Sequence, residues 1–458
     1  MTAILDADHL VVGAGATGLA FADALVDHSD ARVVIVDRRD GPGGHWREAY
    51  PFVRLHQSSA FYGVPSTLLG GGHLQESGPE KGLQERASQP EIIDYYEHAL
   101  ARLEATGRVR FLPGSEYADG EVVSLATGER QAVPDRCRVV DAHYLAPTIP
   151  AEVPPPFAVD GARVVPVNDL ARLEDSPSQY VVVGSGKTAT DAIVWLLQRD
   201  VDPGAIRWVR PREPWMFNRA VVQPDPAIFL GMAADVWESA ARASSLDDMF
   251  LRMEDAGVML RIDRTLTPTM ARAPTIAQWE VDLLRTVEDV VRLGHVRSAE
   301  RGRLVMDGGT ATIADDALVV HCAASGLQMP PLVPVWGPDV ITLQPIRAGF
   351  PCFGAALIGY VEATRDDDAE KNRLCLPSHY GNTLADWVEM NLLGSRATAA
   401  FTSAPDVKAW ADSIALYPAR VPAGYPPSPA LDAARARLAE YSGPGMARAH
   451  EFVAAARL

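Results

Sequence analysis

Three glycines near the N-terminus have the spacing of a turn that holds a dinucleotide. Gly13, Gly15 and Gly18 form GAGATG between an apolar run and a helix-like stretch. The first glycine allows a tight turn, the second lets the backbone approach a pyrophosphate, and the third lets the helix pack against the strand. The helix N-terminus then offers N–H groups and a positive dipole end to the phosphates. The alternative is a glycine turn that only packs.

The acid that follows this motif indicates which dinucleotide binds. Asp37 ends the next apolar run, and Arg38 follows it. A carboxylate at this strand end can bind both ribose hydroxyls and repels a 2′-phosphate. The first motif therefore predicts FAD or NAD rather than NADP, and Arg38 is counted with the candidate cofactor-binding residues.

A second glycine motif lies in the middle of the chain. GSGKTA places Gly184 and Gly186 in the first two positions, followed by Lys187 and Thr188, with Ala189 in the third position. Alanine is a known variant there, because the helix only has to approach the strand closely. An ATP-binding P-loop needs four residues between its glycines, and one residue separates them here, so the spacing excludes that motif.

Two arginines end the strand that follows the second motif. Arg210 and Arg212 lie in WVRPR, which contains no acid. Guanidinium groups suit a 2′-phosphate because they are always charged and bind it bidentately. The second site is therefore predicted to bind NADPH. The alternatives are NADH, or no nicotinamide at all with both arginines in surface ion pairs.

The elements that position these motifs follow from hydrophobic patterning. Residues 9–37 and 180–212 each run strand, glycine turn, helix, strand, which is a parallel βαβ unit. An amphipathic helix is predicted from Glu91 to Gly107. A proline-rich stretch at 149–157 suits a domain boundary.

The predicted fold is α/β, with two Rossmann-type dinucleotide-binding domains. A discontinuous FAD domain with C-terminal helices is expected at 1–150 and 317–458. An NAD(P)H domain is inserted at 151–316, and it includes a helical insertion at about 214–294.

Three further segments carry predictions that the structure can test. AQWEVDLLRTVEDVVRLG, at 277–294, has a helical pattern. The charge run TRDDDAEKNR, at 364–373, is interpreted as a solvated loop. The apolar segment 344–364, which contains Arg347, either returns to line a substrate pocket or only packs as a strand and helix.

Composition limits the possible partners and compartment. The 458 residues carry a net charge of −17, which opposes binding to nucleic acid and to anionic membranes. Four widely separated cysteines without zinc-type spacing predict no metal site and fit reduced thiols in the cytoplasm. No signal peptide or membrane-spanning run is recognised. A homo-oligomer is possible.

Taken together, the motifs resemble those of the two-dinucleotide-domain flavoproteins, and most of all the class B flavin-containing monooxygenase group, which includes N-hydroxylating and Baeyer–Villiger enzymes. The resemblance is carried by GAGATG, GGHW followed by YP, HYLAPTIP, GSGKTATD and HCAASG. One departure is clear. The group's fingerprint before the second glycine motif has phenylalanine and histidine where this chain has Val159 and Val165, although Gly161 is in place.

The resemblance implies FAD and NADPH as cofactors, with NADPH reducing the flavin and O₂ forming a C4a-peroxyflavin that oxygenates a small substrate. The irregular aromatic segment 43–64 is then the expected flavin cradle. Gly44 would allow close backbone approach, Trp46 would form a wall, and Gln57 would place an amide near the reactive flavin carbon. Arg54 and Ser58 are further catalytic candidates.

Three functions stay open from the sequence pattern. The leading one is an NADPH-dependent monooxygenase acting on a nitrogen, sulfur or carbonyl substrate. The second is a flavin oxidoreductase that moves hydride without oxygenation, which the missing fingerprint histidine favours. The third is a non-catalytic nucleotide-binding redox sensor. Fold similarity does not decide among them.

Overall fold

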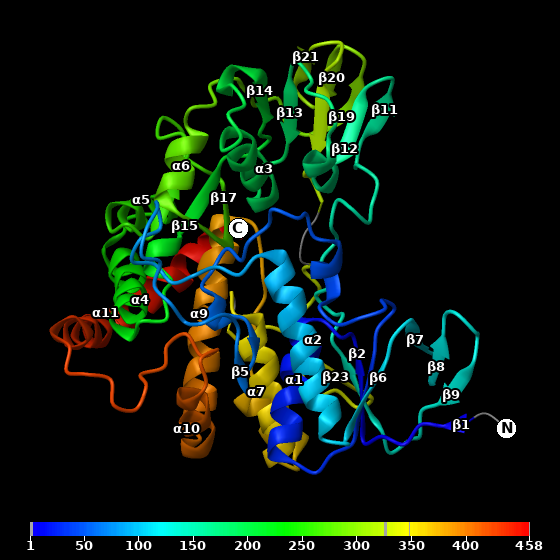
Figure 1. The fold of residues 1–458 in the computed structure, drawn as a ribbon. Coiled ribbons are helices and arrows are strands. Elements are labelled where there is room, and N and C mark those ends of the chain that lie inside the picture. Colours follow the sequence, from blue (N-terminus) through cyan, green and yellow to red (C-terminus); the bar gives the residue numbers. More distant parts are fainter. Residues whose placement is uncertain (1–2, 325–327, 348, 458) are drawn as a thin grey trace.

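The computed structural model of the chain describes residues 3–324, 328–347 and 349–457. Two parallel sheets form its framework (Figure 1). The first sheet has five strands in the order β23-β10-β2-β3-β6. Their bounds are β2 His9–Val12, β3 Val33–Val36, β6 Val109–Leu112, β10 Arg138–Asp141 and β23 Val340–Thr342. Because β23 comes from the last third of the chain, this unit is discontinuous, as predicted.

The second sheet is also five-stranded and parallel, in the order β12-β22-β13-β14-β18. Its strands are β12 Arg163–Pro166, β13 Tyr180–Val183, β14 Ile206–Val209, β18 Val290–Val291 and β22 Leu318–His321. The central strands β13 and β22 are buried along their whole length, since helices and a second layer of strands cover them. The prediction of two Rossmann-type units is confirmed.

Strand β22 corrects one predicted boundary. The first domain was expected to resume at residue 317, but β22 pairs with β12 and β13 of the second sheet. The first sheet resumes only at β23. The return crossing therefore follows β22. Within HCAASG, Ser325 and Gly326 lie outside the described residues.

Each sheet carries its own helices and a side layer that has one parallel and two antiparallel strand pairs. Helices α1 (Ala16–His28) and α7 (Pro351–Thr364) pack together on the first sheet beside α2 (Gln89–Ala105), which confirms the amphipathic helix predicted there. Helices α3 (Lys187–Leu197) and α6 (Gln278–Leu284) accompany the second. The side layers are β1-β9-β8-β7 and β11-β19-β20-β21. Their bounds are β1 Ala3–Ile4, β7 Ser115–Ala118, β8 Glu121–Ser124, β9 Arg130–Ala132, β11 Ala158–Asp160, β19 Val296–Glu300, β20 Arg303–Met306 and β21 Gly309–Thr312.

The insertion predicted as helical is a mixed lobe. Helices α4 (Pro226–Arg242) and α5 (Leu246–Asp255) accompany a three-stranded sheet of β15 (Pro214–Asn218), β16 (Met259–Arg261) and β17 (Met270–Ile276). The C-terminal helices α9 (Leu384–Thr402) and α11 (Pro429–Ala456) pack on this lobe, α11 along α4 and α9 against β17 (Figure 1). Helix α10 (Pro405–Ser413) lies between them in the chain, and β4 (Gly63–Val64) pairs with β5 (Thr67–Leu68).

Two local predictions are wrong for identifiable reasons. The helix expected across 277–294 ends at Leu284, and the following valines form β18, because tertiary pairing with β14 overrides the helical pattern. The charge run expected as a solvated loop contains helix α8 (Asp368–Leu374). Its Lys371 is only 3% exposed and binds Glu362 at 2.6 Å, so this segment closes onto the first unit.

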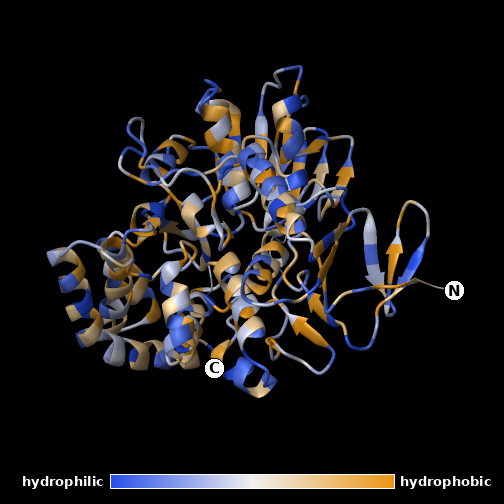
Figure 2. Ribbon diagram, turned by 60° about the horizontal axis from the view of Figure 1, so that its bottom comes forward, coloured by the Kyte–Doolittle hydropathy of each residue, from blue (hydrophilic) through white to orange (hydrophobic). Residues whose placement is uncertain are grey.

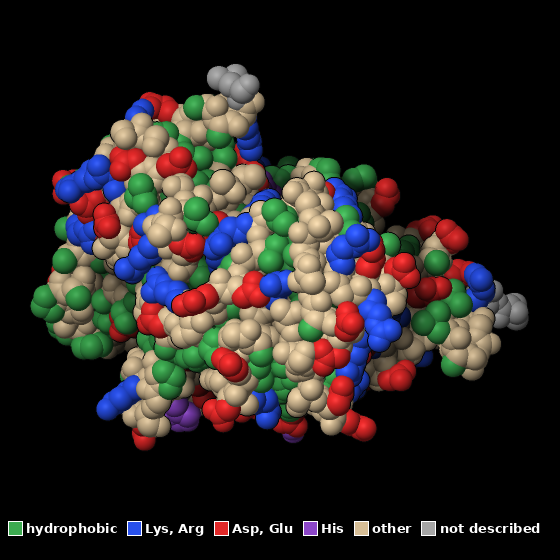
Figure 3. Space-filling model, turned by 90° about the horizontal axis from the view of Figure 1, so that it is seen from above, with side chains coloured by type: hydrophobic (Ala, Val, Ile, Leu, Met, Phe, Trp, Pro, Cys, Tyr) green, Lys and Arg blue, Asp and Glu red, His purple; other side chains and the backbone are tan. Residues whose placement is uncertain are grey.

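One hydrophobic cluster is continuous from the first unit into the lobe, and two further clusters lie on the two faces of the second sheet. Figure 2 shows hydrophobic residues along the strands and helices with one polar and one apolar side. On the face drawn in Figure 3, lysine and arginine lie interspersed with aspartate and glutamate. Among the described residues, no helix combines the length and apolarity needed to cross a bilayer.

Candidate functional site: two glycine turns and a small cavity

The first glycine turn has the geometry that its motif predicts. Gly13 follows β2 with φ of 116°, a conformation that side chains rarely adopt. A β-carbon on Gly18 would lie 2.0 Å from the Gly13 carbonyl oxygen, so the helix packs as close as glycine allows. Helix α1 begins at its N-cap, Gly15, without a side-chain cap, which leaves its first N–H groups for a ligand.

Asp37 stands at the end of β3, next to this turn. It is 2% exposed, and its Oδ2 accepts a 2.8 Å hydrogen bond from the Ala14 N–H. Its other oxygen accepts from the Arg39 N–H at 2.9 Å. These bonds fix the carboxylate beside the turn, where a ribose would lie. Arg38, by contrast, points outward, with its side chain 62% exposed and 3.3 Å from Glu152.

The segment that starts at Gly43 folds back over the first turn. The Gly43 N–H donates to the Ala14 carbonyl at 2.9 Å, and a β-carbon on Gly44 would lie 3.1 Å from the Gly15 Cα. Trp46 follows in a short 3₁₀ helix and is 8% exposed. Its indole N–H donates to the Tyr62 hydroxyl at 2.7 Å, which holds an aromatic wall beside the turn. These features fit a bound dinucleotide.

The second glycine turn is open where a pyrophosphate would pass. Gly184 has φ of 143°, and Gly186 is the N-cap of α3 without a side-chain cap. A β-carbon on Gly186 would meet no atom within 4 Å. Space above an uncapped helix N-terminus is what phosphate binding requires. Thr188 lies in the first turn of this helix and is partly buried.

Lys187 occupies a different place from the one expected of a cofactor ligand. Its ammonium contacts Asp191 and lies 3.1 Å from Glu280. Although burial disfavours the charged amine, these two carboxylates raise the pKa of Lys187 above its ordinary value. The Tyr50 hydroxyl donates to Asp191 at 2.7 Å. Lys187 therefore joins α3 to α6, Asp191 joins α3 to the segment that begins at Gly43, and the ammonium is not presented to a phosphate.

This ion cluster extends across the contact between the two units and the lobe. Arg86 binds Glu80 and lies 3.6 Å from Glu280, while Arg219 lies 3.1 Å from Glu80. Although burial opposes ionisation, Lys187 and Arg86 lower the pKa of Glu280 to about 2. The cluster thus contains three cations and three carboxylates, so its net charge is zero. Because the ion pairs are close, their attraction offsets the cost of burying the charges.

His56 lies beside this cluster as a neutral imidazole. Burial, and then the charges of Lys187 and Arg86, lower the pKa of His56 to about 3. Its Nδ1 accepts a 3.3 Å hydrogen bond from the Thr275 N–H on β17. Because Nδ1 must be unprotonated to accept, the bond and the pKa agree. His56 therefore ties the aromatic segment to the lobe.

The two arginines after β14 lie in different environments. Arg210 is 1% exposed, lies 4.5 Å above the Trp208 ring and binds Glu213 at 3.0 Å. Arg212 is partly buried and donates to the Asn382 side-chain oxygen at 3.1 Å. The prediction that both present to a 2′-phosphate is therefore not met by Arg210, whose charge glutamate already neutralises.

A third arginine, which the sequence did not single out, accompanies Arg212. The Nε of Arg272 on β17 is buried and has no hydrogen-bond partner among the described residues. Burial, and then the charge of Arg212, lower the pKa of Arg272. Neither guanidinium forms an ion pair within the described part of the chain. Only the insertion's fold brings Arg272 here, so no spacing rule would have found it.

The three catalytic candidates from the aromatic segment lie in three different settings. Gln57 is 4% exposed and lines a small cavity of about 40 Å³ with Arg347 and Phe350. Ser58 is fully buried and accepts from the Ala60 N–H at 3.3 Å, as the cap of a 3₁₀ helix. Arg54 is exposed on a separate surface hollow of about 690 Å³. The structure thus does not bring the three together, and of the three only Gln57 lines the cavity that contains Arg347 and Phe350.

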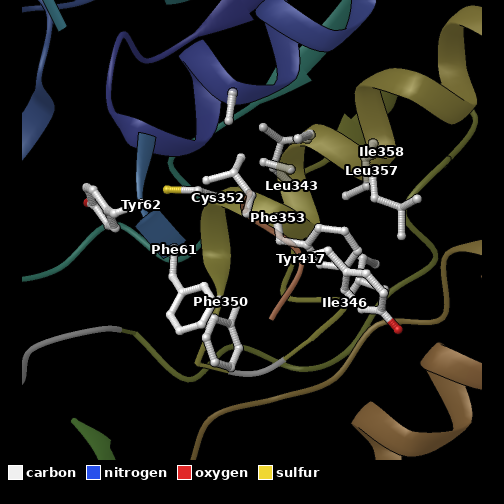
Figure 4. Close-up of a cluster of buried hydrophobic side chains, with 14 of the residues drawn as sticks. Phe61, Tyr62, Leu343, Ile346, Phe350, Cys352, Phe353, Leu357, Ile358 and Tyr417 are labelled. Atoms are coloured by element: carbon white, nitrogen blue, oxygen red, sulfur yellow. The ribbon is translucent and has the colours of Figure 1, made fainter. Parts of the chain in front are cut away.

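The segment 344–364 does return to line this cavity, in its first half. Figure 4 shows Phe350 beside Phe61, with Tyr62 and Cys352 nearby. The Phe61 and Phe350 rings lie 5.2 Å apart, edge to face. The second half, α7, packs on α1. All four cysteines are buried, and the described residues contain no cluster of side chains suited to a metal ion.

Comparison with known proteins places the chain among relatives and similar folds. Residues 11–64 match the family model described as NAD(P)-binding Rossmann-like domain. Among solved structures, closed cyclohexanone monooxygenase superposes with a TM-score of 0.47 at 17% identity, covering 97% of this chain and 98% of that one. A mutant flavin monooxygenase from Stenotrophomonas maltophilia gives a TM-score of 0.44 at 15% identity, covering 77% and 89%. At these levels, neither similarity extends to activity.

Two mycobacterial proteins are much more similar in sequence. The uncharacterized protein Rv2000 of Mycobacterium tuberculosis and the uncharacterized protein Mb2023 of Mycobacterium bovis are each 41% identical to this chain over 418 residues. The alignment covers 90% of this chain and 78% of each relative. The chain therefore belongs to the family of Rv2000 and Mb2023, and within it carries an N-terminal Rossmann-like dinucleotide-binding segment followed by a second one.

Proposed function

We propose that this protein is an FAD- and NADPH-dependent monooxygenase acting on a small nitrogen-, sulfur- or carbonyl-containing substrate. The observation that carries the proposal is the pairing of two uncapped glycine turns in one chain. The aromatic segment 43–64 lies against both: Gly43 hydrogen-bonds Ala14 of the first turn, and Tyr50 hydrogen-bonds Asp191 on the helix of the second. A segment that contacts both turns would lie between the bound FAD and the bound NADPH.

The first turn is the better fit for FAD. Asp37 would bind the ribose hydroxyls, the N-terminus of α1 would bind the pyrophosphate, and Trp46 would bound the ring site. Bound FAD would supply the two-electron transfer and the reaction with O₂. The residues around it do what a protein contributes: they orient the cofactor and exclude water with buried aromatic side chains.

The second turn is the better fit for NADPH. The open space over Gly186 would take the pyrophosphate, and the guanidiniums of Arg212 and Arg272, which have no carboxylate partner among the described residues, would bind the 2′-phosphate. An anion between two cations also offsets their mutual repulsion. This assignment replaces the buried, paired Arg210 with Arg272.

Gln57 is the residue we assign to the reacting end of the substrate. Its amide lies in a cavity otherwise lined largely by apolar side chains, and no hydrogen bond to it is formed within the described residues. An amide that no described residue bonds is available to a ligand in the cavity. Gln57 would therefore orient a polar group of the substrate.

A second candidate function is hydride transfer without oxygenation. The position of the fingerprint histidine is occupied by Val165, which lies on β12 and packs against the apolar core of the second unit. No imidazole is therefore available at that position to couple the two units during NADPH use. This favours an oxidoreductase that passes electrons to another acceptor.

One experiment separates these functions. The purified chain is loaded with FAD, reduced anaerobically with NADPH in a stopped-flow instrument, and mixed with O₂ and a candidate amine, thioether or ketone. A monooxygenase adds one oxygen mass to the substrate with little free peroxide. Release of peroxide with no added oxygen supports hydride transfer alone, and failure to reduce the flavin refutes both.

A further inference from the structure

We infer that the cavity at Gln57 binds the carboxylate of an apolar monocarboxylic acid through Arg347. The inference rests on the proposed function only in naming this acid as the substrate, because a carboxylate site would stand without catalysis. The cavity lies where the first unit, the lobe and α9 meet. Its lining comprises Gln57, Phe217, Val222, Phe229, Met232, Ala273, Thr275, Arg347, Gly349, Phe350, Trp387, Met390, Asn391 and Gly394.

Arg347 is the one charged side chain in this lining, among the described residues. It lies in the loop between β23 and α7, with its guanidinium carbon over the Phe229 ring at 6.0 Å from the ring centre. Across the described part of the chain, its guanidinium forms no ion pair and donates no hydrogen bond. The cavity walls described here contain no aspartate or glutamate. Arg347 is only partly buried, but no described side chain of the lining supplies the counter-charge that cations in apolar surroundings normally have.

The helix opposite makes room for this guanidinium. Gly394 lies inside α9, where glycine is less favourable than alanine. A β-carbon on Gly394 would lie 3.4 Å from the Arg347 Nη1. At this van der Waals distance an alanine methyl would occupy the space beside the guanidinium, and a larger side chain would crowd it. The glycine therefore keeps open the space from which a ligand anion would approach Arg347.

The rest of the lining indicates what the anion is attached to. Phenylalanine, tryptophan and methionine side chains surround Arg347, so the ligand's body is apolar. The cavity of about 40 Å³ holds little more than the acidic group, and Met232 and Met390 are the adaptable side chains that would let it widen. Gln57 and Asn391 add amides, and one N–H of the Asn391 side chain donates to the Trp387 carbonyl at 2.9 Å.

A carboxylate fits these groups better than other anions do. It is planar and matches the forked donors of arginine, so one anion satisfies both N–H groups of the fork. A dianionic phosphate would bring a second negative charge that no further cation in the described lining offsets. The ligand class is therefore a monocarboxylate with an apolar chain or ring.

Binding to the whole chain without turnover tests this inference. Phenylacetate is titrated against phenylacetamide of the same shape, with heat of binding and the fluorescence of tryptophan, including Trp387 in the cavity wall, as readouts. We expect phenylacetate to bind at least tenfold more tightly, a difference of about 1.4 kcal/mol. Arg347→Met should remove this preference while keeping the amide's affinity, Arg347→Lys should keep part of it, and the exposed Arg172→Met should leave it intact.

A second variant protects the test against misfolding of Arg347→Met. Gly394→Ala improves helix propensity and places a methyl beside the guanidinium, so phenylacetate affinity should fall while stability holds. Equal binding of acid and amide, no binding of either, or a preference that survives in Arg347→Met would overturn the inference. A changed spectrum of bound FAD in Arg347→Met, with the preference intact, would assign Arg347 to the flavin. Failure of flavin reduction with carboxylate binding intact would refute only the proposed function.

Discussion

Replacing Gly186 with alanine should separate cofactor binding from folding. The residue has φ of −90°, which alanine adopts without strain, and the added β-carbon would meet no protein atom within 4 Å. Gly→Ala at a compatible position stabilises by about 0.4–1 kcal/mol, because it restricts the unfolded chain. The variant should therefore be as stable as the wild type or slightly more so.

The same methyl would stand where the NADPH pyrophosphate is proposed to pass. Steric exclusion at this distance should weaken NADPH binding at least tenfold, or about 1.4 kcal/mol. Isothermal titration with NADPH, alongside urea denaturation of the same preparations, measures both effects. Gly231→Ala, partly exposed in α4 with the same empty surroundings, is the matched control. Unchanged NADPH affinity in Gly186→Ala would show that the second turn does not hold the pyrophosphate.

Three further predictions follow from the site. Arg272→Met should weaken NADPH at least tenfold and leave NADH nearly unaffected, measured as the ratio of their dissociation constants; an equal loss for both would contradict a 2′-phosphate role. Asp37→Asn should keep the fold yet release FAD on gel filtration, whereas Asp37→Ala should also lose stability through the unpaired Ala14 N–H, by about 1–3 kcal/mol in urea denaturation. Stability should also fall as the pH drops from about 6.5, the ordinary pKa of histidine. The unfolded state then protonates His56, while the folded pKa of about 3 keeps it neutral, which amounts to on the order of 3 kcal/mol by about pH 4.5. His56→Gln should flatten this slope, and an identical slope in the variant would show that other groups set it.

The two glycine turns could be predicted because each is a local device. The spacing of Gly13, Gly15 and Gly18 and the acid at Asp37 need only one strand and one helix to take effect, and the structure reproduces them. The discontinuous first sheet was also predictable, since parallel strands require crossovers. Its boundary was misplaced because β22 and β23 are both short and apolar, and nothing local decides which sheet each joins.

The ligands of the second site depend on contacts that no local rule encodes. Arg210 and Arg212 are two residues apart and looked alike in sequence. Arg210 is turned onto Trp208 and Glu213, whereas Arg212 meets Arg272 from a different sheet. Lys187 likewise follows a glycine, as a phosphate ligand would. Its ammonium instead forms ion pairs with Asp191, one helical turn later, and with Glu280 on α6. Such choices are made by partners that are distant in the chain.

The buried ion cluster at the contact between the two units holds the two units in a fixed arrangement as well as contributing to stability. A balanced set of buried charges rarely stabilises more than apolar packing would, but breaking any one pair is costly. Glu280 on α6 contacts both Lys187 on α3 and Arg86 in the segment before α2. These contacts fix the distance between the two glycine turns. If two cofactors must meet across the aromatic segment, that distance is what the fold has to hold constant. Glu280→Gln should therefore slow flavin reduction by NADPH more than it weakens the binding of either cofactor, and a loss confined to binding would show that the cluster serves the second turn alone.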